Sequence, residues 1–220
     1  MSQSLRHGVW LALFAFVGFW LNSWAVPLFD LDEGAFTEAT REMFARGDFL
    51  MTYLDGAPRY DKPILVYWLQ AASVGTLGWS EFALRLPSML AATGWMWAVW
   101  RFAREASLAL GRDTARARAD GLFAAAALAL SPIPGLIGHA ATADALLNLW
   151  LALTLLDLWR WLAQPTVALA HPRWNDVLLL RIYLWIGLGL LTKGPVAVAL
   201  PLMVALIFAL LHQRWRAALK

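Results

Sequence analysis

The chain has 220 residues, of which 60% are hydrophobic, and its mean hydropathy is +0.57. This composition excludes an ordinary soluble domain, because such domains are about half apolar and the excess here is concentrated in long runs. The absence of cysteine excludes thiol catalysis, disulfides and cysteine-ligated metals. The net charge is only +3, so the pI of about 9.6 does not by itself indicate nucleic-acid binding.

The apolar runs predict an all-α membrane protein, a polytopic bundle of about six transmembrane helices that forms one domain. The predicted spans cover residues 9–28, 82–103, 115–131, 143–163, 177–192 and 195–212. The first run is too long for a signal peptide and lacks a cleavage site, so we expect a span that ends at Pro27. Arg85, at the edge of the second run, is expected to snorkel toward the membrane surface. Residues 136–143 are expected to form a short outer connection.

Residues 29–81 interrupt the apolar pattern and predict an outer loop with its own helices. Residues 35–46 have the period of an amphipathic helix, with Gly47 as its C-cap. Asp55-Gly56 predicts a turn. Residues 64–79 are apolar but too short for a confident span, so we expect a helix that lies in the membrane interface or re-enters it.

The pattern of the helix at 35–46 divides its residues between two faces. The face expected to be buried carries Phe36, Ala39, Met43 and Phe44. The opposite face carries Glu42 and Arg46, whose spacing suits an ion pair on an exposed helical surface.

Lysine and arginine are concentrated in the segments on the side of the two termini. The positive-inside rule therefore predicts cytoplasmic termini and an outer, non-cytoplasmic loop at 29–81. Under this topology Asp32, Lys62, Asp144 and Lys193 come from four segments and reach the same face of the membrane.

The run Asp30-Leu31-Asp32-Glu33-Gly34 places three carboxylates where the first apolar run meets water. A carboxylate that is partly removed from water becomes a stronger base and can accept a proton from an incoming hydroxyl or amine. The alternative interpretation is that Asp30 or Asp32 only caps the N-terminus of the following helix.

The segment Arg59-Tyr60-Asp61-Lys62-Pro63 supplies candidate binding residues for an anion. Lys62 lies at the start of a predicted helix, where its charge and the free N–H groups suit a phosphate. Arg59 and Asp61 are the neighbouring candidates for the same site, and the alternative for Arg59 is a solvated loop residue. The alternative interpretation is an interface lysine that is paired with Asp61.

Asp144 and Lys193 are ionisable residues at predicted span ends. An ionisable residue at membrane depth is a functional hypothesis by default. The alternatives are that Asp144 caps the fourth span and that Lys193 caps the fifth before Gly194. His139 has no partner at metal-ligand spacing, so no metal site is predicted, and a divalent metal cofactor is not indicated.

Five segments resemble, in order, the N-terminal membrane part of bacterial GT-C glycosyltransferases, the family of protein O-mannosyltransferases and of the aminoarabinose transferase that modifies lipid A. They are DLDEGAFTEATREMFARGDF (30–49), YDKPILVYWLQA (60–71), EFALRLPS (81–88), ATADALLNLW (141–150) and LTKGPVAVALP (191–201). The resemblance implies a multi-pass protein of the bacterial inner membrane with its active face in the periplasm. It also implies a polyprenyl-phosphate-linked sugar donor and an acceptor that is lipid A, protein or another glycan.

The resemblance also implies roles for individual residues. Asp32 and Glu33 match the family's Asp-Glu pair at the catalytic centre, and Lys62 matches a lysine associated with the lipid phosphate. Asp144 and Lys193 match further candidates for substrate contact. Family members continue with further helices and often a soluble domain, so we expect a portion of a longer enzyme or a shortened homologue.

Two other functions compete with this interpretation. A transporter or flippase would use Asp32, Asp144 and Lys193 to bind substrate or protons, but transporter sites usually lie near the membrane midplane and not at span ends. The other alternative is a non-catalytic subunit of a membrane assembly.

Overall fold

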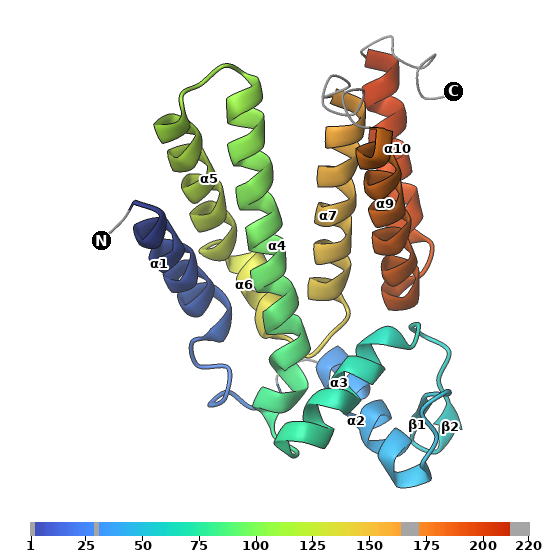
Figure 1. Ribbon diagram of the computed structural model, residues 1–220. Coiled ribbons are helices and arrows are strands. Elements are labelled where there is room, and N and C mark those ends of the chain that lie inside the picture. Colours follow the sequence, from blue (N-terminus) through green and yellow to red (C-terminus); the bar gives the residue numbers. More distant parts are fainter. Residues whose placement is uncertain (1–2, 29–30, 164–171, 212–220) are drawn as a thin grey trace.

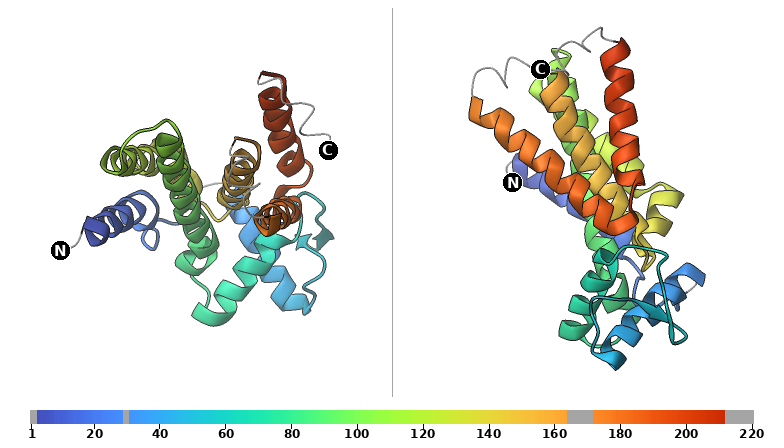
Figure 2. Two further views of the ribbon diagram at one scale, coloured as in Figure 1. Left: turned by 45° about the horizontal axis from the view of Figure 1, so that its top comes forward. Right: turned by 90° about the vertical axis from the view of Figure 1, so that its right-hand side faces the viewer.

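The computed structural model describes residues 3–28, 31–163 and 172–211. These residues form a series of helices and one short hairpin of two strands, which confirms the predicted all-α class. Most of the helices run beside one another along the length of the molecule, while the remaining helices and the hairpin gather at one end (Figure 1). Figure 2 shows the same separation from another side, and we call this end the hairpin end.

The long part of the molecule is a bundle. It contains α1 (Gln3–Ala15), the π-helical turn η1 (Phe16–Trp20), α4 (Glu81–Ala109), α5 (Thr114–Ala129), α6 (Pro132–His139), α7 (Asp144–Ala163), α9 (Pro172–Lys193) and α10 (Val196–Leu211). The hairpin end contains α2 (Leu31–Arg46), β1 (Tyr53–Leu54), β2 (Ala57–Pro58) and α3 (Leu65–Leu77). Helix α4 is central, because α3, α5, α6 and α7 all pack against it.

The described helices differ in their ability to cross a membrane. Helix α7 is by itself long and apolar enough to cross a membrane, over Asp144–Leu162. Helices α5 and α6 are long and apolar enough only when they are taken together as one span, which is bent by 65°. The number of six spans therefore stays a prediction. Large exposed apolar side chains such as Leu202 and Leu206 on α10 are typical of a surface that faces lipid.

The prediction that the first span extends to Pro27 is wrong. The helix ends at Trp20, because Leu21 is extended and Asn22 has a φ of 70°. The next residues turn their carbonyl groups away from any helix axis and toward Arg85 of α4. A continuous helix would have used those carbonyls internally.

The predicted outer connection at 136–143 is wrong in its first half, which belongs to α6. Pro132 lies in the first turn of this helix, where its missing N–H costs nothing. Gly138 of α6 packs against Phe19 and Ala92, and a Cβ there would lie only 2.6 Å from Phe19 Cδ1. This close approach explains how a bent helix fits beside η1.

Helix α2 begins at Leu31, four residues before the predicted start. Asp32 and Glu33 therefore lie in its first turn, where carboxylates interact favourably with the helix dipole. Gly47 follows the last residue with a φ of 66°, which confirms the predicted C-cap.

The predicted faces of α2 are correct for its core and wrong at two residues. Phe44 is 39% exposed, whereas Glu42 is buried. The Glu42 carboxylate accepts hydrogen bonds from Arg46 Nη2 at 3.1 Å and from the backbone N–H of Gly56 at 3.1 Å. Gly56 belongs to the predicted Asp55-Gly56 turn, which joins β1 to β2. Glu42 is therefore covered by this hairpin, which the helical periodicity of residues 35–46 could not reveal.

A second polar network joins α4, α7 and α9 at the other end of the bundle. Asp157 is fully buried and accepts hydrogen bonds from Arg160 Nη1 at 2.8 Å and Trp185 Nε1 at 3.0 Å. Arg160 Nη2 also donates to Glu105 of α4 at 2.7 Å. The three helices are therefore fastened together far from the hairpin end.

The contact of η1 with α5 gives a direct test of this packing. A Cβ at Gly18 would overlap the backbone carbonyl of Ala129, which has little freedom to move. We expect Gly18→Ala to lower the free energy of unfolding by about 1–3 kcal/mol, measured by thermal unfolding in detergent. The control is Gly187→Ala, where a Cβ meets nothing within 4 Å. Equal melting temperatures for the two variants would contradict the close packing.

Candidate functional site

A pocket of about 460 Å³ lies at the hairpin end. Its walls come from the segment 50–64 and from the turn that follows α9. The charged residues in its walls are Arg59, Asp61, Lys62 and Lys193. The fold thus brings together four of the predicted site residues from segments more than a hundred residues apart, and we call this site the cationic pocket.

The hairpin fixes the position of Arg59. Its backbone N–H donates to Thr52 O at 2.8 Å, and Thr52 Oγ1 donates back to Arg59 O at 2.7 Å. The first bond continues the pairing of β1 with β2 by one step beyond the strands, and the Thr52 side chain adds the second. The cation is therefore held by backbone contacts and not only by its own side chain.

The cationic pocket contains an ion-paired group of three residues. Asp61 accepts a hydrogen bond from Lys62 Nζ at 2.7 Å and another from Arg59 Nη2 at 2.8 Å. The hydrogen bond from Lys62 holds the pKa of Asp61 below its ordinary value. The pairing of Lys62 with Asp61, expected as the alternative, is confirmed. One carboxylate among three cations leaves the walls with a positive excess.

A buried pair of aromatic rings, Phe36 and Tyr67, packs beside the guanidinium group of Arg59. The Phe36 ring lies 5.7 Å from the guanidinium carbon and stacks on Tyr67 at 5.3 Å between centroids. Burial raises the pKa of Tyr67, and the nearby charge of Arg59 opposes that rise. Within the described residues, Arg59 Nε and Tyr67 Oη are buried without a hydrogen-bond partner. Such groups are costly unless something bonds to them.

Asp144 and Lys193 form an ion pair between two helices. Asp144 is the first residue of α7 and Lys193 the last of α9, so each charge lies at the helix end that favours its sign. The two side chains are 40% and 29% exposed. Both capping alternatives are compatible with these positions, but the two residues also meet each other.

The two predicted catalytic carboxylates have different environments. Asp32 is exposed in the first turn of α2, whereas the next residue, Glu33, is fully buried. Asp30, the third carboxylate of this run, lies outside the described residues.

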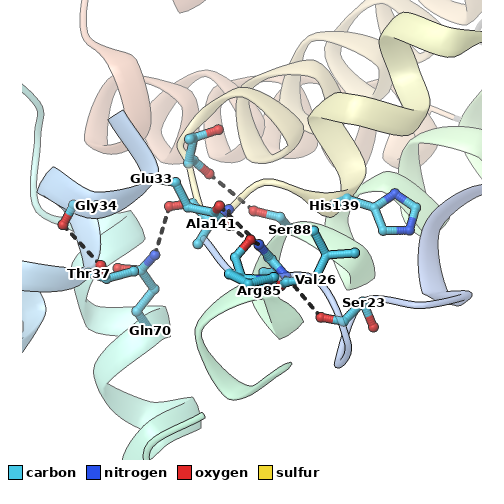
Figure 3. A network of polar contacts seen from close by, with 12 residues as sticks. Ser23, Val26, Glu33, Gly34, Thr37, Gln70, Arg85, Ser88, His139 and Ala141 are labelled. Atoms are coloured by element: carbon cyan, nitrogen blue, oxygen red, sulfur yellow. Dashed lines mark hydrogen bonds and ion pairs between the residues drawn. The ribbon is translucent and has the colours of Figure 1, made fainter. Parts of the chain in front are cut away.

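Glu33 forms a buried, bidentate ion pair with Arg85 of α4 (Figure 3). Arg85 Nε donates to Glu33 Oε1 at 2.7 Å and Nη2 donates to Oε2 at 3.0 Å. The prediction of a snorkelling Arg85 is wrong, because its side chain is only 1% exposed.

Arg85 uses all of its N–H donors. Besides Glu33, it donates to the carbonyls of Ser23 at 3.0 Å, Val26 at 2.6 Å and Pro27 at 2.9 Å. A guanidinium has five donors and no acceptor, so two bonds to carboxylate and three to carbonyls satisfy it completely. The side chain therefore fastens the segment after η1 and the start of α2 to α4.

The segment that leads into Asp144 is held from three sides. Glu33 Oε1 accepts from Ala141 N at 2.9 Å, and Gln70 Nε2 of α3 donates to Ala141 O at 3.0 Å. Ser88 Oγ of α4 donates to Thr142 O at 3.2 Å. Three elements therefore set where α7 begins, and with it the position of Asp144.

Two residues at this end were not predicted as part of the site: Tyr67 was not singled out, and Arg85 was expected only to snorkel. Both lie inside segments that carry the family resemblance, EFALRLPS and YDKPILVYWLQA. The available signal was an arginine within an apolar helix, which is costly unless it is paired. Nothing in the local pattern indicated which carboxylate would be its partner.

This helical bundle, with a pocket lined by charged side chains at its hairpin end, has the fold of the GT-C glycosyltransferases. The family model described as dolichyl-phosphate-mannose-protein mannosyltransferase matches residues 61–220, so the chain belongs to that family.

Curated relatives include two proteins named as undecaprenyl phosphate-alpha-4-amino-4-deoxy-L-arabinose arabinosyl transferases. The one from Sodalis glossinidius is 30% identical over 97% of this chain and 36% of its own length. The one from Serratia proteamaculans is 30% identical over 94% of this chain and 35% of its own length. The chain therefore spans about a third of the length of these relatives.

Solved structures with the same fold include ArnT from Cupriavidus metallidurans, 24% identical to this chain. The structure bound to undecaprenyl phosphate has a TM-score of 0.75, over 96% of this chain and 36% of that one. The apo structure has a TM-score of 0.78, over 97% and 37%. These similarities confirm the predicted helical membrane fold.

The buried ion pair predicts a specific stability pattern. We expect Arg85→Met or Glu33→Gln alone to lower the free energy of unfolding by about 3–5 kcal/mol, because each leaves a buried group unpaired. The double variant should be less destabilised than the sum of the two single variants, as measured in a double-mutant cycle by thermal unfolding. The control, Arg41→Gln, removes an exposed pair with Glu38 and should leave unfolding unchanged. Additive effects would contradict a coupled pair.

Proposed function

We propose that this chain forms the donor-phosphate and base-bearing part of a membrane glycosyltransferase. It moves a sugar from a polyprenyl-phosphate-linked donor, with undecaprenyl phosphate as the carrier, to a hydroxyl of lipid A, protein or another glycan. The observation that carries this proposal is the convergence of Arg59, Lys62 and Lys193 in one pocket, at the same end of the bundle as Asp32 and Asp144. The names of the relatives support the choice of donor.

The cationic pocket suits the leaving group of this reaction. A sugar linked through a phosphodiester carries one negative charge, whereas the released phosphate monoester carries about 1.5 to 2 negative charges near neutral pH. Positive charge fixed beside the phosphate therefore stabilises the transition state more than the bound donor.

Asp32 is the candidate general base. The acceptor oxygen attacks the anomeric carbon and forms the new C–O bond, while the bond from that carbon to the phosphate oxygen breaks. The electron pair stays on the phosphate oxygen, and the acceptor proton moves to the Asp32 carboxylate. Asp144 is a second carboxylate for orienting the acceptor. No general acid is required, because phosphate is already a good leaving group.

Glu33 has a positioning role in this proposal and does not contact substrate. Both of its oxygens are bonded to Arg85, and Oε1 also accepts from the backbone of Ala141. It therefore fixes the first turn of α2, which carries Asp32. Asp61 has an analogous role toward Lys62 and Arg59.

We infer the membrane topology from the charge distribution of the sequence. We place the hairpin end and residues 29–81 at the periplasmic face, with α2 and α3 in the membrane interface where a lipid carrier can reach the pocket. The charged residues proposed for the site, Asp32, Lys62, Asp144 and Lys193, lie at the hairpin end of the bundle, which favours a transferase over a transporter with a site at mid-membrane.

The first test separates chemistry from binding. In nanodiscs that contain undecaprenyl-phosphate-linked sugars, Asp32→Asn should lower the rate of sugar transfer by a factor of roughly 10² or more. Its binding of undecaprenyl phosphate and its melting temperature should not change. Lys62→Ala should weaken binding of undecaprenyl phosphate by about tenfold, through loss of a charged contact.

The matched control for both variants is Glu38→Gln, which removes an exposed charge on α2. Normal transfer by Asp32→Asn would remove Asp32 from the mechanism. Unchanged lipid binding by Lys62→Ala would remove the cationic pocket from the donor site.

A second test uses pH. The hydrogen bond from Lys62 lowers the pKa of Asp61, so this carboxylate stays charged even at pH values somewhat below its ordinary pKa, and its pairing is lost only as the pH falls through the lowered pKa. Binding of undecaprenyl phosphate should therefore tighten between about pH 5 and 7, because the phosphate takes its second charge near pH 6. The same slope is expected in Asp61→Asn, as measured by titration of lipid binding. A slope that disappears in this variant would contradict the assignment.

A further inference from the structure

Two ion pairs at the hairpin end differ in their freedom to move. Glu33 and Arg85 are 0% and 1% exposed, and the guanidinium has no donor to spare. Asp144 and Lys193 are 40% and 29% exposed, and they meet through a single pair of atoms. The first pair is fixed, whereas the second can separate at the cost of a partly solvated contact.

Lys193 has two places available to its charge. It contributes to the wall of the cationic pocket and it also bonds to Asp144, which is not among the residues of the pocket wall. Its ammonium lies on a flexible four-carbon stem, so it can turn without movement of the helix. Gly194 follows with a φ of 72° and ends α9. Lys193 therefore lies between the cationic pocket and the carboxylate of Asp144.

We propose that a lipid-linked phosphate draws Lys193 away from Asp144, and that the released carboxylate then faces the acceptor. This inference rests on the proposed function, because it assumes that the phosphate enters the cationic pocket. The phosphodiester of the donor carries one negative charge, as a carboxylate does, and it gains further charge as its bond to the sugar breaks, when it becomes a monoester with three acceptor oxygens. The pull on the lysine is therefore strongest in the transition state and in the complex with undecaprenyl phosphate. Arg59 and Lys62 already bring that phosphate to the pocket.

The exchange links the two halves of the reaction. With the donor site empty, Asp144 is neutralised by Lys193 and is a poor partner for an acceptor. When the phosphate binds, the acceptor side gains a second carboxylate beside Asp32. Linkage makes the effect reciprocal, so a group that engages Asp144 strengthens phosphate binding by releasing Lys193.

The test is a double-mutant cycle on the affinity of the full chain for undecaprenyl phosphate in nanodiscs. Asp144→Asn should tighten binding by roughly two- to fivefold, because Lys193 no longer has to leave a carboxylate. Lys193→Met should weaken binding. In the Lys193→Met background, Asp144→Asn should change nothing. Undecaprenol, which lacks the phosphate, should show none of these effects, and Glu38→Gln is the control for the loss of a carboxylate elsewhere.

Two outcomes would overturn the exchange. Equal tightening with and without Lys193 would show that Asp144 acts only through its general negative field. Weaker binding in Asp144→Asn would show that the carboxylate holds Lys193 in place for the phosphate. If Asp144→Asn does not fold, Asp144→Ser and Lys193→Gln repeat the cycle.

The same data distinguish the exchange from the proposed function itself. Binding that depends on Lys62 but not on Asp144 leaves the donor site intact and rejects the exchange. Binding that is absent, or that survives Lys62→Ala, rejects the donor site and the exchange together.

Discussion

The buried ion pair of Arg85 and Glu33 is the interaction on which the hairpin end depends. Removing two charges from water is expensive, and the cost is offset only where each polar group is bonded. The structure meets that condition, because the guanidinium gives two bonds to Glu33 and three to backbone carbonyls. The same pair orders the segment after η1, the start of α2 and, through Ala141, the approach to α7. The pair therefore contributes to the positions of both Asp32 and Asp144, the second together with Gln70 and Ser88.

For a charged side chain such as Lys193 to change its partner, the groups around it must be held in fixed positions by a rigid frame. Lys62, Arg59 and Asp61 are fastened to the hairpin, while Arg85 and Glu33 are fastened to the bundle, so the distance between the two sets is fixed by the fold. Substrate charges then meet groups that are already oriented, which is the condition for electrostatic catalysis without reorganisation. Partly exposed pairs can change partners inside this frame at small cost.

The sequence predicted the features that local pattern controls and missed those that distant contacts control. Helix α7, the cap at Gly47 and the turn at 55–56 follow from periodicity and from residues that favour positive φ. The end of η1, the helix α6 and the burial of Glu42 do not, because each depends on an element far away in sequence. Arg85 shows the limit most clearly: its position at the edge of an apolar run suits snorkelling, and only the presence of Glu33 and three carbonyls makes burial favourable. Convergence of Lys62 with Lys193 was predicted from topology and is confirmed by the shared pocket.

The neighbourhood of Lys193 shows how its charge can move while the helices stay in place. The preceding residue, Thr192, is fully buried and accepts a hydrogen bond from Trp150 of α7 at 3.1 Å. Trp150 in turn stacks on Trp185 of α9 at 5.8 Å, and Trp185 donates to the buried Asp157. Helices α7 and α9 are thus joined by continuous contacts from the far end of the bundle up to the residue before Lys193. Any transfer of this lysine from Asp144 to a phosphate must therefore be a rotation of its side chain, which needs no domain motion and is compatible with a rigid donor site.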